Sequence, residues 1–223
     1  MTPVQMTIAI LLSVIGAYLC GSIPFGLLIG KIKGIDIRRH GSGNIGATNV
    51  TRVIGKGWGK LCFALDFLKG CLPVLVLVVL TGQTGCLKDE YGILPCAAAL
   101  AAVCGHVYPV WIGFKGGKGV STAAGAILAL SPLPLLTALA VWVAVFYISR
   151  YVSLASILAA AFLPAACWLY GLAGIGRKAS GTELGLLILL AVLTILKHAS
   201  NIKRLCNGTE NRFERKTDEG KDA

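Results

Sequence analysis

The chain has 223 residues, 56% of them hydrophobic, and a net charge of +11. A soluble domain of this length is far more polar, and each membrane span uses roughly 20 apolar residues, so the composition predicts one membrane domain and leaves no room for a separate soluble domain. The basic excess does not indicate nucleic acid as a partner, because Lys and Arg of membrane proteins concentrate in cytoplasmic loops and these loops lack interleaved aromatic residues.

Seven apolar runs follow one another along the chain, and all seven are predicted to be helical because lipid excludes open strands. They lie near residues 5–29, 61–81, 91–113, 119–131, 133–149, 152–173 and 183–200. The run at 119–131 is short and predicts a partial span shielded by protein. The fold class is therefore all-α, a polytopic integral membrane protein with seven transmembrane helices in residues 1–206. Residues 207–223 are polar and charged and are predicted to be a disordered cytoplasmic tail.

The distribution of Lys and Arg predicts the orientation. Four segments carry most of the basic charge: the loop 30–60, the linker 113–118, Arg150 and the tail from Lys197. With seven spans, these four segments fall on one side of the membrane, and the other side carries only Lys88, Arg177 and Lys178. The basic side is predicted to be cytoplasmic, which places the N-terminus outside and the C-terminus in the cytoplasm.

The first basic loop contains Gly41-Ser42-Gly43-Asn44-Ile45-Gly46-Ala47-Thr48-Asn49 and ends near Arg52. Glycine lets backbone N–H groups approach an anion closely, the small polar side chains add donors, and Arg offers a charged fork to phosphate. The pattern also matches the G-x-G-x-x-G dinucleotide fingerprint, which requires a preceding strand; a membrane helix precedes it here. The loop is therefore predicted to bind a phosphate, the alternative being a flexible linker.

The second basic loop reads Phe114-Lys115-Gly116-Gly117-Lys118-Gly119 and leads into the short apolar run. It is no Walker A motif, because the first glycine is wrongly spaced and no Ser or Thr follows Lys118. Helix N-termini attract anions, and membrane proteins use half-helix ends to meet anionic substrates. Lys115 and Lys118 are thus predicted to contact an anion, although lysines there also fit the positive-inside rule alone.

Three pairs of polar residues at i, i+3 spacing lie within or at the ends of apolar runs. They are Asp66 with Lys69, Ser153 with Ser156, and His198 with Asn201. Charges within spans are costly and face polar interiors, so the first pair is either a structural ion pair or a substrate contact. Capping is the ordinary role of such serines. A lone His is more often structural, but the basic residues around His198 favour a functional role.

Together these segments resemble the bacterial acyl-phosphate:glycerol-3-phosphate acyltransferases, the PlsY family. The resemblance rests on residues 21–26, 41–52, 66–70 and 105–119 and extends over about 21–204. It implies a multi-pass inner-membrane enzyme of phospholipid biosynthesis with a cytoplasmic active site. The enzyme would transfer a fatty acyl group from acyl phosphate to the 1-position of glycerol 3-phosphate, giving lysophosphatidic acid and phosphate. The resemblance implies no metal or other cofactor, and no partner beyond the substrates and membrane lipids.

The resemblance also implies the site residues. The catalytic set is Ser42, Arg52, Lys115 and His198, and the substrate-binding set is Gly41, Gly43, Asn44, Gly46, Ala47, Thr48, Asn49, Lys118, Ser153, Ser156 and Asn201. One departure is Ala199-Ser200 between the final His and Asn, where the family often has a charged or polar pair. Acyl phosphate is already activated and no G-x-S-x-G elbow is present, so direct attack by the substrate hydroxyl is expected, with His198 or the leaving phosphate as base.

Two other functions fit parts of the sequence. A transporter of phosphate-bearing or other organic anions shares the spans and the basic half-helix, but it should show a two-fold hydropathy repeat, which this sequence lacks. A non-catalytic membrane scaffold explains the hydrophobicity but not two glycine-rich basic loops on one side. The acyltransferase is the function that the sequence favours.

Overall fold

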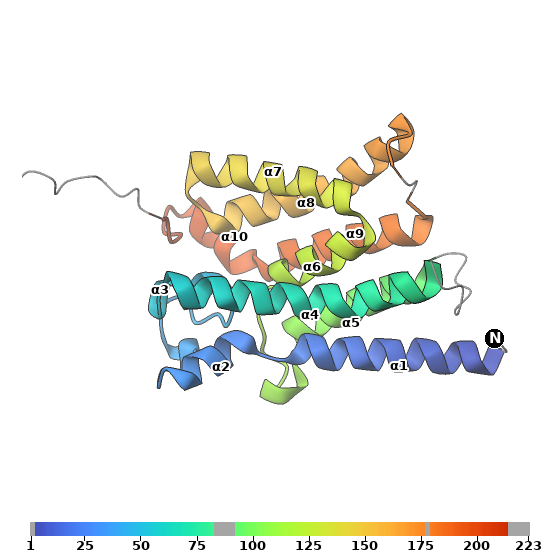
Figure 1. Ribbon diagram of the computed structural model, residues 1–223. Helices are drawn as coiled ribbons and strands as arrows, with labels where there is room; N and C mark the ends of the chain where they lie inside the picture. The colour runs from blue at the N-terminus through green and yellow to red at the C-terminus, as the bar shows by residue number, and fades with distance from the viewer. Residues whose placement is uncertain (1–2, 83–91, 177–178, 214–223) are drawn as a thin grey trace, which may run out of the picture.

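The computed structural model describes residues 3–82, 92–176 and 179–213, and all regular structure in these ranges is helical (Figure 1). The α-helices are α1 (Pro3–Ser22), α2 (Phe25–Ile32), α3 (Ala47–Val53), α4 (Lys56–Gly82), α5 (Ile93–Val107), α6 (Val120–Leu130), α7 (Pro132–Ser149), α8 (Val152–Ala173), α9 (Gly181–Lys197) and α10 (Ala199–Cys206). Two 3-10 turns, η1 (Ile37–Arg39) and η2 (Val110–Ile112), complete the set. The predicted all-α class is confirmed.

The helices present apolar side chains outward, which lipid solvates and water does not. Leu12, Leu172 and Leu196, on α1, α8 and α9, are each about two-thirds exposed. Within the described residues, five helical segments are long and apolar enough to cross a membrane, or six if α9 and α10, which are bent by 55° at their junction, form one span. All seven predicted runs are helical, but α6 has only 11 residues. The structure therefore supports five or six full spans and leaves α6 as a shorter segment.

Glycine lets several helix pairs approach backbone to backbone, as in other membrane helix interfaces. A methyl group on Gly21 of α1 would collide with the carbonyl of Ala102 on α5. On α4, a methyl group on Gly70 would likewise strike the carbonyl of Thr122 on α6. Close packing of α6 against α4 fixes the start of the short helix, and with it the loop that carries Lys118.

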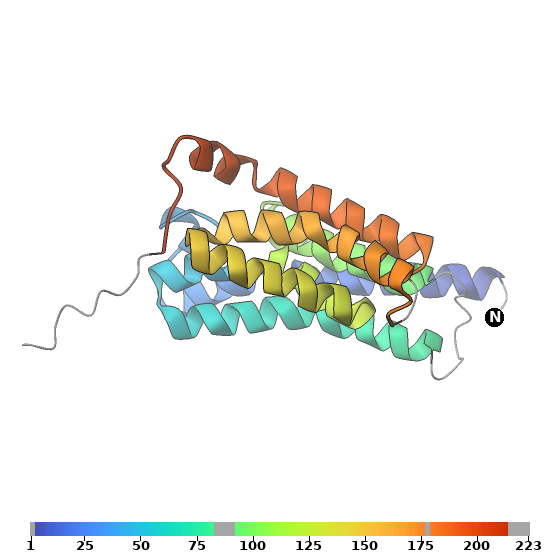
Figure 2. The ribbon, with the colours of Figure 1, turned by 90° about the horizontal axis from the view of Figure 1, so that it is seen from above.

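Figures 1 and 2 show α2, α3 and α10 together at one end of the molecule, opposite the labelled N-terminus. Three of the basic segments belong to this end: the loop 30–60, the junction of α7 and α8, and the stretch from Lys197. The predicted loops of the other side lie partly outside the described residues, and Lys88, Arg177 and Lys178 are among those not described.

The C-terminal segment 207–213 packs against the helices. Glu210 is only 9% exposed, and the backbone N–H of Phe213 donates to the carbonyl of Arg150 (3.1 Å). The predicted disordered tail 207–223 was thus wrong for its first seven residues, because a polar sequence is ordered when each buried polar group finds a partner. Residues 214–223 lie outside the described part of the chain.

Candidate active site

A cavity of about 430 Å³ opens among the basic loops and the ends of α3, α4, α7, α8 and α10. Most of the predicted site residues line it, namely Ser42, Asn44, Gly46, Ala47, Thr48, Asn49, Arg52, Lys118, Ser153, Ser156, His198 and Asn201. Three predicted residues, Lys115, Gly41 and Gly43, are not among its lining residues. Chain segments more than 150 residues apart in sequence therefore share one polar space.

The side chain of Asn49 organises the first loop. It is almost fully buried, and its Nδ2 donates to the carbonyls of Ile37, His40 and Asn44 at 3.2, 3.0 and 2.9 Å. Its Oδ1 accepts from the backbone N–H of Ser42 at 2.8 Å. These bonds occupy the Asn49 amide, so Asn49 shapes the loop that carries Ser42; its predicted substrate contact stays a prediction, and the residue lines the cavity.

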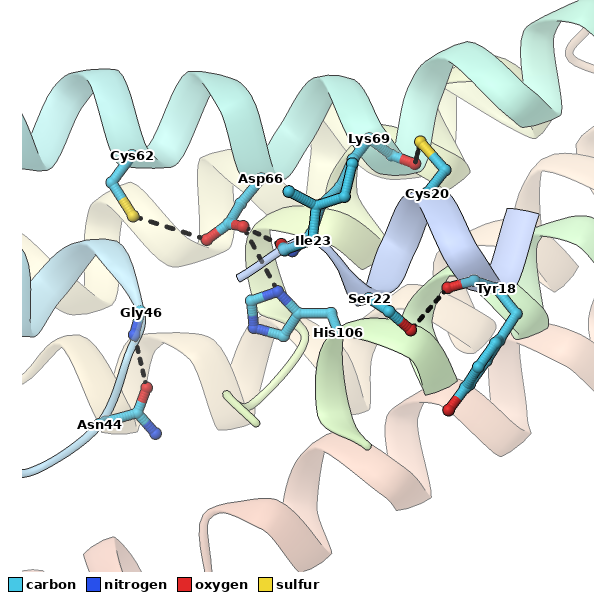
Figure 3. Close-up of polar contacts among 10 residues, drawn as sticks. All are labelled: Tyr18, Cys20, Ser22, Ile23, Asn44, Gly46, Cys62, Asp66, Lys69 and His106. Carbon is cyan, nitrogen blue, oxygen red and sulfur yellow. Dashed lines mark hydrogen bonds and ion pairs between the residues drawn. The ribbon is translucent and has the colours of Figure 1, made fainter. Parts of the chain in front are cut away.

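Backbone N–H groups of the first loop also donate hydrogen bonds within the loop. Gly46 N donates to Oδ1 of Asn44 at 2.8 Å (Figure 3), and Gly43 N donates to the carbonyl of His40 at 3.0 Å. Gly41 and Gly43 have φ of +61° and +69°, a left-handed conformation that glycine adopts without strain. Both glycines therefore serve the turn that carries Ser42 and Asn44 to the cavity.

Lys118 is the cavity lysine of the second loop. Its Nζ donates to Oδ1 of Asn201 at 2.6 Å, and burial lowers its pKa to about 8, an effect that nearby Glu210 opposes. Lys115 is exposed and lies outside the cavity lining. The predicted catalytic role of Lys115 thus has no geometric support, and Lys118 is placed to hold an anion instead.

The second cation of the cavity is Arg52, at the end of α3. One guanidinium nitrogen, Nη2, donates to the backbone carbonyl of Asn211 at 3.4 Å, and its Cζ lies 5.2 Å from the centre of the Phe213 ring. A cation over an aromatic face is attracted by the ring quadrupole. The C-terminal segment 207–213 therefore orients Arg52 from the far side of the cavity.

The ring of His198, which lies between α9 and α10, is held by the last turn of α9. The structure places Nδ1 at 2.8 Å from the carbonyl of Thr194. A carbonyl only accepts, so Nδ1 carries the proton and Nε2 of the neutral ring is left as an acceptor. His198 is 2% exposed and lines the cavity, and this arrangement suits a group that removes a proton.

Glu210 is the residue that sequence reasoning missed. Its Oε1 accepts from Ser153 Oγ (2.8 Å) and Asn201 Nδ2 (2.7 Å), and its Oε2 accepts from Arg204 Nε (2.7 Å). Burial by itself raises the pKa of Glu210, but the bonds from these three donors outweigh it and hold the pKa below its usual value. Glu210 is therefore a carboxylate in a site of cations and neutral donors.

Asp66, Lys69 and His106 form a buried network that joins α4 and α5 to the α1–α2 break (Figure 3). Oδ1 of Asp66 lies 2.8 Å from Lys69 Nζ and 3.5 Å from His106 Nδ1. Lys69 also donates to the carbonyl of Ile23 at 2.7 Å. Pro24 follows Ile23 and interrupts the helix, and the Ile23 carbonyl at this break accepts from both Lys69 and the backbone N–H of Phe25. Of the alternatives that the sequence left open for this pair, the structure supports the structural ion pair.

The network reaches the active site through His106, which lines the cavity. The carbonyl of His106 accepts from the backbone N–H of Gly117 at 3.1 Å, and a methyl group on Gly117 would strike Nε2 of the same ring. The position of His106 therefore sets the position of the Gly-Gly-Lys-Gly loop and of Lys118.

Comparison with known proteins identifies the family to which this site belongs. A sequence model described as glycerol-3-phosphate acyltransferase matches residues 11–208. The chain belongs to this family. Curated glycerol-3-phosphate acyltransferases include that of Trichlorobacter lovleyi, 48% identical over 198 residues (89% of this chain, 94% of the relative). That of Aquifex aeolicus is 48% identical over 200 residues (90% and 97%).

Solved structures agree with this assignment. A crystal structure of PlsY (YgiH), an integral membrane glycerol 3-phosphate acyltransferase, in its glycerol 3-phosphate form matches with a TM-score of 0.79 at 46% identity, covering 92% of this chain and 96% of that chain. The lysophosphatidic acid form matches with a TM-score of 0.77 at 45% identity, covering 92% and 95%. The family resemblance seen in the loops, and with it the prediction of an acyltransferase, is confirmed.

A second, apolar cavity of about 250 Å³ adjoins the polar cavity of this acyltransferase. It lies among α6, α7, α8 and α9, and four residues line both spaces: Phe63, Val120, Trp142 and Ser156. Trp142 Nε1 donates to Ser156 Oγ at 3.1 Å, and Ser156 Oγ donates to the carbonyl of Val152. Ser156 is thus engaged in the wall between the two cavities.

Proposed function

We propose that the protein transfers a fatty acyl group from acyl phosphate to the 1-hydroxyl of glycerol 3-phosphate, giving lysophosphatidic acid and inorganic phosphate. The observation that carries the proposal is the union of two unlike spaces. A polar cavity with Arg52 and Lys118 suits phosphate groups, and the adjoining apolar cavity among α6, α7, α8 and α9 suits an acyl chain. Acyl phosphate carries both a phosphate and an acyl chain, and it can place one group in each cavity where the two cavities share a wall.

The reaction follows from placing the two reactants on either side of that wall. The 1-hydroxyl oxygen attacks the acyl carbonyl carbon, a carbon–oxygen bond forms, and the bond from the acyl carbon to the phosphate oxygen breaks. The electron pair leaves with inorganic phosphate, and the hydroxyl proton goes to Nε2 of His198 or to the departing phosphate. Arg52 and Lys118 offset the charge of the phosphates and of the developing oxyanion, and holding both reactants in line lowers the entropic part of the barrier.

Ser42 and the start of α3 line the same cavity as these cations. We place the acyl phosphate against Asn44 and Thr48, and the glycerol 3-phosphate against Ser42, Ser153, Asn201 and His198, all of which line the same cavity. We further propose that the basic end with α2, α3 and α10 faces the cytoplasm of a bacterial inner membrane. The N-terminus then lies outside, and α6 is the partial seventh span.

The test uses purified protein with acyl phosphate and glycerol 3-phosphate, and repeats the assay with acyl-CoA and acyl carrier protein as donors. The proposal expects lysophosphatidic acid and phosphate in equal amounts from the first donor alone. A His198→Ala variant with full activity would remove His198 as the base and leave the departing phosphate in that role. Uptake of glycerol 3-phosphate by sealed vesicles without product would instead identify a transporter.

A further inference from the structure

The segment 207–213 closes one side of the polar cavity and is fixed at both ends. At its start, the N–H of Gly208 and that of Thr209 donate to the carbonyls of Leu205 and Arg204. At its end, Phe213 packs edge-on against Phe146 with ring centres 5.9 Å apart, and its N–H bonds the carbonyl of Arg150. Glu210, midway along the segment, therefore has a defined place in the cavity wall.

Glu210 is the one carboxylate among the described residues that line the cavity, whereas Arg52, Lys60, Lys118 and Arg204 bring positive charge to it. An isolated buried carboxylate is strongly unfavourable, but three charge-assisted hydrogen bonds compensate for its burial. Two of its partners, Ser153 and Asn201, are residues that the proposed function assigns to glycerol 3-phosphate. The carboxylate thus acts on substrate-binding side chains and not on the helix scaffold alone.

The bond to Asn201 has a directional consequence. An ionised carboxylate only accepts, so Asn201 must turn its Nδ2 toward Glu210, and its Oδ1 then points to Lys118 Nζ at 2.6 Å. The chain Glu210–Asn201–Lys118 fixes the ammonium group of a lysine that stands 92 residues away in sequence. The second carboxylate oxygen of Glu210, Oε2, accepts a hydrogen bond from Nε of Arg204 at 2.7 Å.

We propose that Glu210 is a positioning residue for glycerol 3-phosphate: its carboxylate sets the orientation of Asn201 and Lys118 and holds Ser153 and Arg204 in the cavity wall. The proposal rests on the proposed function for the identity of the substrate. A different role, in which Glu210 imitates the phosphate and competes with it, is less well supported. Lys118 donates to the Asn201 amide oxygen and Arg52 donates to the carbonyl of Asn211, so neither cation forms a hydrogen bond with Glu210 that a phosphate would have to displace.

The experiment compares Glu210→Gln, which keeps the shape and removes the charge, with Glu210→Asp, which keeps the charge on a shorter stem. Thr209→Ala is the matched control, because it alters an exposed residue of the same segment. Steady-state rates are measured against glycerol 3-phosphate at saturating acyl phosphate, from pH 6.5 to 9.5. Stabilisation of each purified variant against heat by glycerol 3-phosphate is measured in parallel, since a ligand that binds the native state raises the unfolding temperature.

The Gln variant is expected to raise KM for glycerol 3-phosphate by about tenfold or more, the usual effect of losing a hydrogen bond to a charged group, while KM for acyl phosphate changes little. The Asp variant should recover part of the loss. The charged and titratable groups that face Lys118 are Glu210, Arg204, Arg52 and His198. Removal of the one anion among them should move the alkaline loss of activity in the Gln variant to lower pH.

Two results overturn the proposal. A Gln variant with the KM and alkaline limb of the wild type shows that Glu210 does not position the site, and a KM below the wild-type value shows that Glu210 competes with the phosphate. If the proposed function itself is wrong, the wild type forms no lysophosphatidic acid. Thermal stabilisation by glycerol 3-phosphate then still shows whether Glu210 affects binding of that ligand. If the Gln variant does not fold, the Asp variant and its thermal response decide the question.

Discussion

The two lysines of the second basic loop provide a sharp test of the site, because they are three residues apart and only Lys118 lines the cavity. Replacing Lys118 with Met removes an ammonium–phosphate interaction and leaves Oδ1 of Asn201 without its donor. Hydrogen bonds to charged groups contribute about 1.5–3 kcal/mol, and about 1.4 kcal/mol corresponds to tenfold. We expect KM for glycerol 3-phosphate to rise about tenfold to a hundredfold in Lys118→Met and to change less than about twofold in Lys115→Met.

The pH dependence gives a second measure of the same side chain. The pKa of Lys118 is lowered to about 8, so the group is charged below pH 8 and neutral above it. The second pKa of a phosphate monoester is about 6, so the substrate keeps its charge over this range. Affinity should therefore fall as pH rises, and with a pKa near 8 the charged fraction drops about tenfold between pH 7 and pH 9. KM should rise by up to that factor in the wild type and stay flatter in Lys118→Arg.

The assay is the initial rate of lysophosphatidic acid formation against glycerol 3-phosphate concentration, at saturating donor and constant ionic strength. Lys115→Met serves as the control, because it removes the same charge from the same loop. The reasoning is refuted if Lys115→Met is the more damaging variant, or if the wild-type KM does not change between pH 7 and pH 9.

Three further predictions concern other parts of the molecule. Asp66→Asn leaves Lys69 buried without its counter-charge and should lower stability by about 3–5 kcal/mol; an unchanged unfolding temperature in detergent would contradict the network described for Asp66. Gly70→Ala should lower the unfolding temperature and the yield of folded protein, whereas Gly171→Ala, whose added methyl group meets nothing within 4 Å, should not; equal behaviour of the two would argue against close packing of α4 on α6. Ala138→Leu should raise KM for long-chain acyl phosphates more than for short-chain ones, as it fills the apolar cavity by about three carbons, each worth about 0.8 kcal/mol; a chain-length-independent effect would place the acyl group elsewhere.

The structure also gives the C-terminal segment a place in the site that composition did not suggest. The one local signal near Glu210 is Gly208, since glycine commonly marks the end of a helix. That signal predicts where α10 stops but not that the chain turns back into the cavity. A polar stretch is ordered or disordered according to the partners it finds, and here the partners of Glu210 come from α8 and α10.

The sequence by itself determined the helices and the two basic loops. Hydropathy, glycine content and loop charge are local properties, and each apolar segment is long enough or too short for a span by its own composition. It also placed His198 and Asn201 on one stretch of chain, since residues three apart on a helix share a face. Only the tertiary structure decided that Lys118 and not Lys115 lines the cavity, that the Asn49 amide is hydrogen-bonded within its own loop, and that Glu210 belongs to the site. Those outcomes depend on which distant segments meet, and such contacts are set by the packing of helices rather than by any local pattern.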